Sequence, residues 1–229
     1  MSLITRVALV TLAALLAAPA LAQTKPASFP DEYYYRNNEG KRRPEYKKLE
    51  GKPVPAISVG DWIGSAVDVK DAKGKVVVID FWATWCGPCM KSIPKNVELV
   101  DEFKDKGLVF VGVHDFNDGW DKAAAVVKSN KINYPVGRDA TGGASQKRFG
   151  VISWPTYIVV DKFGIVRAAG LVPSRVRDVV SVLIDEPGPK PGEAGMSEFP
   201  ADYYVAGSRR PKSLIDIEGK LLADLPAAT

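Results

Sequence analysis

The sequence contains few of the residues that bind metals, and this scarcity excludes several classes of function. Among its 229 residues are two cysteines, Cys86 and Cys89, and a single histidine, His114. A metal site needs several ligands of these kinds, so we expect no metal. The pair Gly142-Gly143 matches no phosphate-binding fingerprint. The net charge of +4, from 31 basic and 27 acidic residues, is too small to indicate nucleic-acid binding.

Long apolar runs are also scarce, and the one that stands out lies at the N-terminus. Arg6 precedes a charge-free run over residues 7–18, and residues 20–22 (ALA) are small enough for cleavage before Gln23. This pattern predicts an export signal peptide over residues 1–22. An uncleaved anchor is the alternative, although the run is shorter than the ~20 apolar residues of a spanning helix. Export implies an oxidising, extracytoplasmic compartment such as the periplasm.

Two residues separate the two cysteines, which lie at the predicted start of a helix. Residues 76–81 (VVVIDF) have the apolar, β-branched character of a buried central strand, and residues 86–104 favour a helix. A cysteine at a helix N-terminus has a lowered pKa, because the helix dipole and the free N–H groups favour the thiolate. Thiolates attack disulfides, so we expect Cys86, partly exposed, to attack and the more buried Cys89 to resolve. An inert structural disulfide is the alternative.

The segment FWATWCGPC (81–89) resembles the active site of thioredoxins. Asp80 stands where thioredoxins carry a buried acid, and Trp154-Pro155-Thr156 resembles their cis-proline loop. The approach GKPVPAI (51–57) is similar to that of the TlpA/ResA-like branch, which is extracytoplasmic. The resemblance covers about residues 50–185. It implies an α/β thioredoxin fold, with a mixed central sheet flanked by helices on both faces.

Asp80 is the candidate proton acceptor that the resemblance implies. The TlpA/ResA-like pattern often has glutamate three residues after the second cysteine, where this chain has Ser92, and asparagine where it has Asp80. Burial would raise the pKa of Asp80 by disfavouring its anion. Asp80 would then take a proton from Cys89 during resolution. The alternative is an ordinary buried acid satisfied by hydrogen bonds.

The resemblance also implies a substrate-binding set around the cysteines. Pro155 would have a cis peptide bond that turns Trp154 towards Cys86. The Trp154 main chain would pair with an extended substrate, with a simple core residue as the alternative. Trp85 would shield the sulfur, and Gly87-Pro88 would form the tight turn between the cysteines.

The remaining elements follow from the same periodicities. We expect a strand at 108–113, helices at 120–129, 144–149 and 176–184, a loop at 133–143, and an antiparallel hairpin of 157–161 with 165–169. We interpret His114, which follows the first of these strands, as a structural or solvated residue. A pH-dependent contact at the rim of the active site is the alternative.

Two similar segments flank the predicted domain. FPDEYY (29–34) and RRPEYKKLEGK (42–52) return in the same order as FPADYY (199–204) and RRPKSLIDIEGK (209–220). We therefore divide the chain into a signal peptide (1–22), a Tyr/Arg-rich N-terminal arm (23–50), a thioredoxin-like domain (51–186), and a Pro/Gly linker with a C-terminal arm (187–229). One interpretation is that the arms are extended segments that dock on the domain or on a partner. The alternatives are disordered tails, surface motifs without function, or the trace of a lost tandem domain.

These observations predict an exported thiol–disulfide oxidoreductase that reduces protein disulfides through a mixed-disulfide intermediate. No bound cofactor is needed, because the cysteine pair is itself the redox group. The resemblance implies two partners, namely protein disulfide substrates and a membrane thiol–disulfide electron donor. Nucleic acid and metal are not expected.

Three alternatives remain open at this point. The same chemistry run backwards would make the protein a disulfide-forming oxidase or isomerase, which the reduction potential distinguishes. A thiol peroxidase would need a P-x-x-x-T-x-x-C pattern, which is absent from the sequence. A non-enzymatic interaction module would use the arms and retain only a vestigial cysteine pair.

Overall fold

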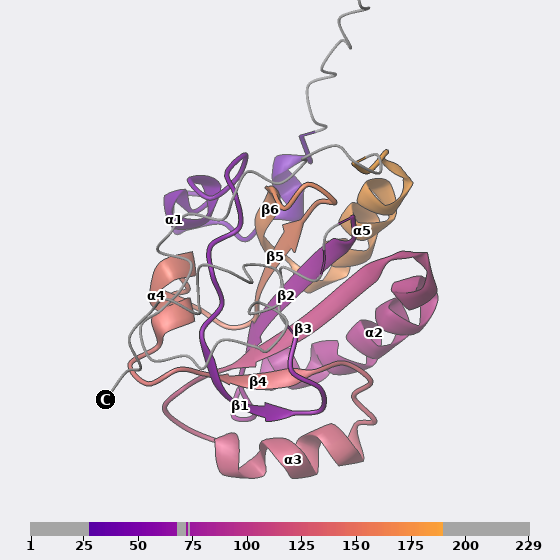
Figure 1. Ribbon diagram of the computed structural model, residues 1–229. Helices are drawn as coiled ribbons and strands as arrows, with labels where there is room; N and C mark the ends of the chain where they lie inside the picture. Colours follow the sequence, from indigo (N-terminus) through magenta and orange to yellow (C-terminus); the bar gives the residue numbers. More distant parts are fainter. Residues whose placement is uncertain (1–27, 68–71, 73, 190–229) are drawn as a thin grey trace, which may run out of the picture.

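The computed structural model describes residues 28–67, 72 and 74–189. Within them the chain forms a six-stranded sheet in the order β1-β4-β3-β2-β5-β6 (Figure 1). Strands β2, β3 and β4 run parallel, and β1, β5 and β6 pair antiparallel with their neighbours. The strands are β1 (Val59–Ile63), β2 (Val76–Trp82), β3 (Leu108–His114), β4 (Val136–Asp139), β5 (Thr156–Val160) and β6 (Val166–Leu171). This is the mixed sheet that the sequence predicts.

Helices cover both faces of the sheet. In Figure 1, α2 (Gly87–Phe103) and α5 (Val176–Asp185) lie on one side, and α1 (Pro44–Lys47) and α4 (Ala144–Phe149) lie on the other. The helix α3 (Trp120–Ser129) lies by β1 and β4 and packs against the hydrophobic cluster on the α2 side. The predicted architecture, helices on both faces of a mixed sheet, is therefore confirmed.

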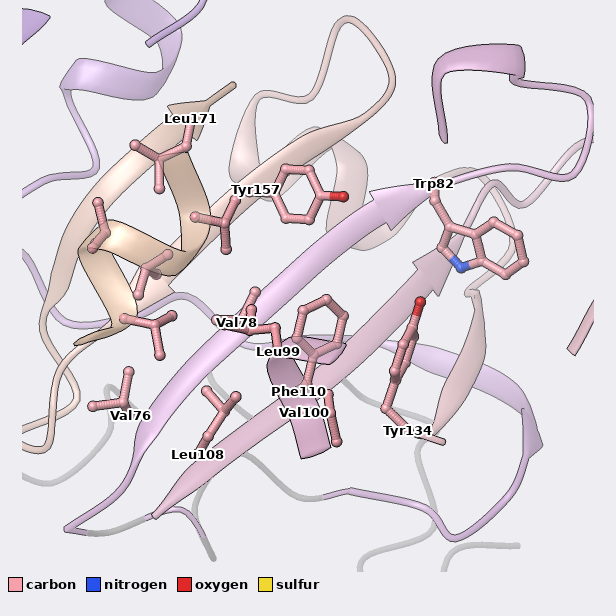
Figure 2. Packing of buried hydrophobic residues seen from close by; sticks show 14 of the residues in the cluster. Val76, Val78, Trp82, Leu99, Val100, Leu108, Phe110, Tyr134, Tyr157 and Leu171 are labelled. Carbon is pink, nitrogen blue, oxygen red and sulfur yellow. The ribbon is translucent and has the colours of Figure 1, made fainter. Parts of the chain in front are cut away.

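The central strand β2 is buried along all seven of its residues. Alternate side chains of a strand point to opposite faces, so Val76 and Val78 enter the cluster under α2 and α5, whereas Val77 and Ile79 enter the cluster on the other face. Figure 2 shows the first of these clusters, with Phe110 of β3 beside them. Because neither face of β2 meets solvent, its nearly continuous apolar run was recognisable in the sequence.

Most predicted elements agree with the structure to within a few residues, but the region predicted as a loop at 133–143 contains a strand. Val136 is fully buried and opens β4, which pairs in parallel with β3 and antiparallel with β1. Only four residues form this strand. Its short sequence, VGRD, has too little alternation to stand out among the turn residues around it.

The N-terminal arm is also more structured than predicted. It contains a 3₁₀ turn (Asp31–Tyr33) and the helix α1, and Tyr34 and Tyr46 are buried at 4% and 2% exposure. The arm runs along the outer edge of β6. The Tyr35 N–H donates to the Gly170 carbonyl at 2.9 Å. Covering an edge strand satisfies backbone groups that would otherwise face solvent.

One ion pair fastens this arm to the sheet. Arg42 stacks on the ring of Tyr34, 3.4 Å from the ring centroid, and its guanidinium pairs with Glu50. Glu50 in turn accepts the N–H of Ala169 on β6 at 3.0 Å. Described residues 28–50 therefore pack on the domain, as one of the readings of the repeat expects. The signal-peptide segment and the C-terminal copy lie outside the described residues.

Candidate active site

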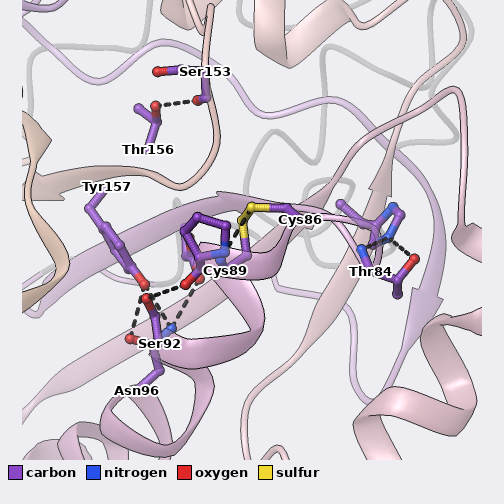
Figure 3. The surroundings of a disulfide bond; sticks show 11 residues. Thr84, Cys86, Cys89, Ser92, Asn96, Ser153, Thr156 and Tyr157 are labelled. Carbon is purple, nitrogen blue, oxygen red and sulfur yellow. Dashed lines mark hydrogen bonds between the residues drawn. A yellow bond between two sulfur atoms is a disulfide. The ribbon is translucent and has the colours of Figure 1, made fainter.

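The redox pair lies where the chain leaves β2 and enters α2. Cys86 is the N-cap residue of α2 and is joined to Cys89 by a disulfide bond (Figure 3). The Cys89 N–H donates to the Cys86 sulfur at 3.2 Å. The N–H groups of the first helical turn have no partner within the helix, and they point at the capping atom together with the positive end of the helix dipole. Cys86 therefore lies at the helix start where the sequence predicts the attacking sulfur. Gly87 and Pro88 form the first turn of the helix between the two sulfurs.

The expectation of a partly exposed Cys86 is wrong for this oxidised form. Cys86 is 5% exposed and Cys89 is 2% exposed. Cys89 is the more buried, as predicted, but both belong to the hydrophobic cluster under α2. Trp154 packs against the same cluster, and its ring meets that of Trp85 edge to face, with centroids 5.4 Å apart.

The two tryptophans differ in their environments. Trp85 is 52% exposed, whereas Trp154 is half-buried and packs against both hydrophobic clusters. The Trp154–Pro155 peptide bond is cis, and Pro155 is buried. The indole therefore packs against the core, as the alternative interpretation of Trp154 expects, while part of the side chain stays at the surface. Trp82 is buried and packs edge to face on His114, as a packing residue does.

Asp80 is a buried carboxyl group in the middle of β2. It is 3% exposed, and its Oδ2 accepts a hydrogen bond from Asn96 Nδ2 at 3.0 Å. Burial raises the pKa of Asp80 from 3.8 to about 8, against the opposing effect of hydrogen bonds from Tyr157 and Asn96. Among the described residues, its Oδ1 has no hydrogen-bond partner. A carboxyl group with this pKa can hold or release a proton near neutral pH.

Asn96 and Tyr157 extend this carboxyl into a polar cluster that the sequence did not reveal. Asn96 donates to the Tyr157 hydroxyl at 3.0 Å, and Tyr157 lies opposite Asp80 across the β2–β5 pair. In Figure 3, Asn96 lies below Cys89 and Tyr157 lies to the left of it, with Ser92 beside them. Burial and the Asp80 carboxylate also raise the pKa of Tyr157. The available signal was that Asn96 falls at helical spacing on the same face of α2 as Cys89 and Ile93.

His114, the last residue of β3, supports the loop that precedes Trp85. It is fully buried, its Nδ1–H donates to the Asp115 carbonyl at 2.8 Å, and its Nε2 accepts the N–H of Thr84 at 3.0 Å. These two partners require the neutral imidazole. Burial lowers the pKa of His114 accordingly. His114 therefore supports the loop just before Trp85 from the end of β3, and the solvated position that the sequence also allowed is wrong.

Two features are absent from the described residues. In this part of the chain no three His, Cys, Asp or Glu side chains come together as a possible metal site. Over the same residues, none of the helices has the length and apolar character needed to cross a membrane.

Comparison with known proteins places this site in a family. The Redoxin family model matches residues 49–183. The thiol-disulfide oxidoreductase ResA of Bacillus thuringiensis subsp. konkukian is 38% identical over 119 residues, which are 52% of this chain and 68% of that protein. ResA of Bacillus subtilis is 31% identical over 149 residues, covering 63% of this chain and 78% of that protein.

Solved structures agree with the same assignment. A thioredoxin-like protein in its oxidised form superposes with a TM-score of 0.54 at 25% identity, over 60% of this chain and 97% of that one. A thiol:disulfide interchange protein of the thioredoxin family from Chlorobium tepidum gives 0.50 at 27% identity, over 59% and 99%. The chain belongs to the Redoxin family and has the thioredoxin fold. Within the thioredoxin superfamily it is a TlpA/ResA-like thiol–disulfide oxidoreductase.

The raised pKa of Asp80 predicts a pH-dependent gain in stability for Asp80→Asn. The folded-state pKa of about 8 lies above the ordinary value of 3.8, so the folded protein retains a proton that the unfolded chain releases. The wild type therefore loses stability as pH rises between these two values. Relative to wild type, oxidised Asp80→Asn should gain on the order of 1–3 kcal/mol between about pH 5 and pH 8.

Urea unfolding of both oxidised proteins at the two pH values measures this difference. Asp61→Asn is the matched control, because Asp61 is an exposed aspartate of β1. It should show no comparable gain. A stability difference between Asp80→Asn and wild type that is independent of pH would show that Asp80 titrates normally in the folded protein.

Proposed function

We propose that this oxidoreductase is exported and reduces disulfide bonds in protein substrates. The observation that carries the proposal is the Cys86–Cys89 pair at the N-terminus of α2, with the Asp80 carboxyl buried in the adjoining strand. Relatives named thiol-disulfide oxidoreductase ResA support the reaction class. The GP dipeptide between the cysteines, which resembles that of reducing thioredoxins, favours the reducing direction.

In the proposed cycle, the Cys86 thiolate attacks one sulfur of a substrate disulfide. A mixed disulfide forms, and the other substrate sulfur leaves as a thiolate. Cys89 then loses its proton and attacks Cys86, which releases the second substrate thiolate. The substrate gains two electrons, and the Cys86–Cys89 disulfide is restored. A thiol–disulfide electron donor in the membrane returns the pair to the dithiol state, as the resemblance to the TlpA/ResA-like branch implies.

Asp80 is the proposed acceptor of the Cys89 proton. Its pKa of about 8 lies close to that of an ordinary cysteine thiol, about 8.5. Proton transfer between groups of similar pKa has a free-energy change close to zero, whether the transfer is direct or passes through water. The Asp80→Asn variant should therefore resolve mixed disulfides more slowly although it folds more stably. Wild-type turnover by this variant across about pH 6–9 would exclude the role.

The proposed substrate-binding residues surround this pair. Trp85 and Trp154 offer a half-exposed aromatic surface, and the main chain before Pro155 offers backbone groups for an extended substrate. Gly87 and Pro88 keep the turn between the sulfurs narrow, so that an approaching chain meets no large side chain there.

Trapping on cysteine variants tests the order of the two attacks. Cys89→Ser should accumulate mixed disulfides with proteins of the same compartment, because attack proceeds and resolution does not. Cys86→Ser should accumulate none. Alkylation followed by non-reducing electrophoresis distinguishes the two variants, and the double variant serves as the control. Accumulation on Cys86→Ser instead would reverse the assignment of attacker and resolver.

The reduction potential separates the reductase from its nearest alternative, a disulfide-forming oxidase. We expect a value nearer to that of thioredoxin, about −270 mV, than to that of an oxidase such as DsbA, about −120 mV. Equilibration of the wild-type pair in glutathione or dithiothreitol buffers, read by alkylation, gives the value. A potential in the oxidase range would support disulfide formation as the function.

Export is proposed from the signal-like sequence of residues 1–22. Protein isolated from the extracytoplasmic fraction should begin near Gln23, which N-terminal sequencing or intact mass detects. An Ala20→Lys variant should impair cleavage, because a large charged residue replaces a small one at the processing site. A chain recovered with an intact Met1 in the membrane fraction would favour the uncleaved anchor.

A further inference from the structure

Tyr46 connects the N-terminal arm to the loop that carries the cis-proline. It lies in α1, before the first residue of the Redoxin match at 49, and its side chain is 2% exposed. Its hydroxyl lies 3.1 Å from Thr156 Oγ1, 110 residues further along the chain. The N–H of Ile152 also donates to this hydroxyl, at 3.4 Å. One buried hydroxyl group therefore contacts the loop on both sides of Trp154-Pro155.

The hydrogen bonds of this hydroxyl have a single consistent direction. Thr156 has one O–H, and it donates to the Ser153 carbonyl at 2.7 Å. Thr156 Oγ1 must then accept from Tyr46, whose oxygen accepts from Ile152. The bonds run from the Ile152 N–H through Tyr46 and Thr156 to the Ser153 carbonyl. This series of hydrogen bonds joins residues 152–156 to the arm.

The ring of Tyr46 packs against β6 at a position where a glycine leaves room for it. Gly170 has φ +79°, and a Cβ atom at that position would lie 2.3 Å from Cδ2 of Tyr46. The neighbouring segment is anchored as well, because Glu50 accepts the N–H of Ala169 and pairs with Arg42. The hydroxyl therefore reaches the loop from a buried ring whose segment is anchored to β6.

We propose that Tyr46 is a positioning residue that holds the 152–156 loop in the conformation that binds protein substrates. This inference rests on the proposed function in assigning Trp154 and Pro155 to substrate binding. An extended substrate needs a fixed backbone partner, whereas a small disulfide needs only access to Cys86. Loss of the hydroxyl should therefore weaken binding of protein substrates and leave the thiol chemistry unchanged.

The C-terminal copy of the arm lacks this residue. Counted from RRP, Ser213 takes the place of Tyr46, and counted back from EGK, Leu214 does. Counterparts of Tyr34, Arg42 and Glu50 are kept, as Tyr204, Arg209 and Glu218. The two copies therefore share the residues that fasten the first arm to β6, and differ at the residue that contacts the loop.

Tyr46→Phe tests the proposal, because it removes the hydroxyl and keeps the buried ring. The matched control is Tyr34→Phe, which removes another buried arm hydroxyl, one that interacts with Glu50 and not with the loop. Insulin is the protein disulfide, and 5,5′-dithiobis(2-nitrobenzoate) is the small disulfide. Tyr46→Phe should raise KM for insulin about fivefold, as expected for one buried hydrogen bond, with kcat unchanged. Its rate with the small disulfide and its reduction potential should stay at wild-type values.

Tyr34→Phe should keep the wild-type KM for insulin. Thr156→Val should raise KM as Tyr46→Phe does, and the double variant should be no worse than either single one, because all three break the same chain of bonds. Thr156→Ser, which retains the hydroxyl, should restore the wild-type KM. An unchanged KM in Tyr46→Phe, or equal losses with both disulfides, would overturn the proposal.

Amide hydrogen exchange gives a second readout that needs no substrate. In Tyr46→Phe, peptides covering residues 151–156 should exchange faster, and those covering β6 should keep their protection because the arm stays docked. Unchanged exchange over 151–156 would contradict the positioning role. If wild type reduces the small disulfide and not insulin, the proposed reduction of protein disulfides fails, and faster exchange in the variant still identifies Tyr46 as the support of the loop.

Discussion

The complete burial of β2 is the constraint on which the rest of the structure depends. This strand lies between β3 and β5, and its side chains enter both hydrophobic clusters. The chain passes from β2 into α2 through residues 83–86, so the helix N-terminus and Cys86 lie at the end of this buried strand. The same burial surrounds Asp80 with apolar groups and raises its pKa. The position of the sulfur and the proton affinity of the carboxyl thus have one physical origin.

The polar cluster below the disulfide limits the cost of that burial without removing it. A buried carboxylate without partners is strongly unfavourable, and Asn96 satisfies one oxygen of Asp80 while Tyr157 fixes the orientation of Asn96. A group fully satisfied as an anion would have a low pKa and could not take up a proton near neutral pH. The incomplete satisfaction of Asp80 is therefore consistent with a proton-accepting role. Stability and the proposed proton transfer make opposite demands on this side chain.

The N-terminal arm belongs physically to the domain although the family match begins at residue 49. It covers the exposed edge of β6, and Tyr46 reaches from it to the loop before β5. In this chain the arm supplies a hydrogen-bonded contact with that loop through Tyr46.

The sequence by itself determined the elements whose signals are local. The continuous β-branched run of β2, the spacing of α3 and α4 and the cysteine pair at a strand–helix junction each depend on neighbouring residues, and each was predicted. Resemblance to thioredoxins supplied Asp80 and Pro155. Tertiary structure alone decided the strand β4, the burial of Cys86, the partnership of Asp80 with Asn96 and Tyr157, and the contact between Tyr46 and Thr156. Those features join segments 16 to 110 residues apart, and no periodicity within one segment encodes which distant side chain will share its buried space.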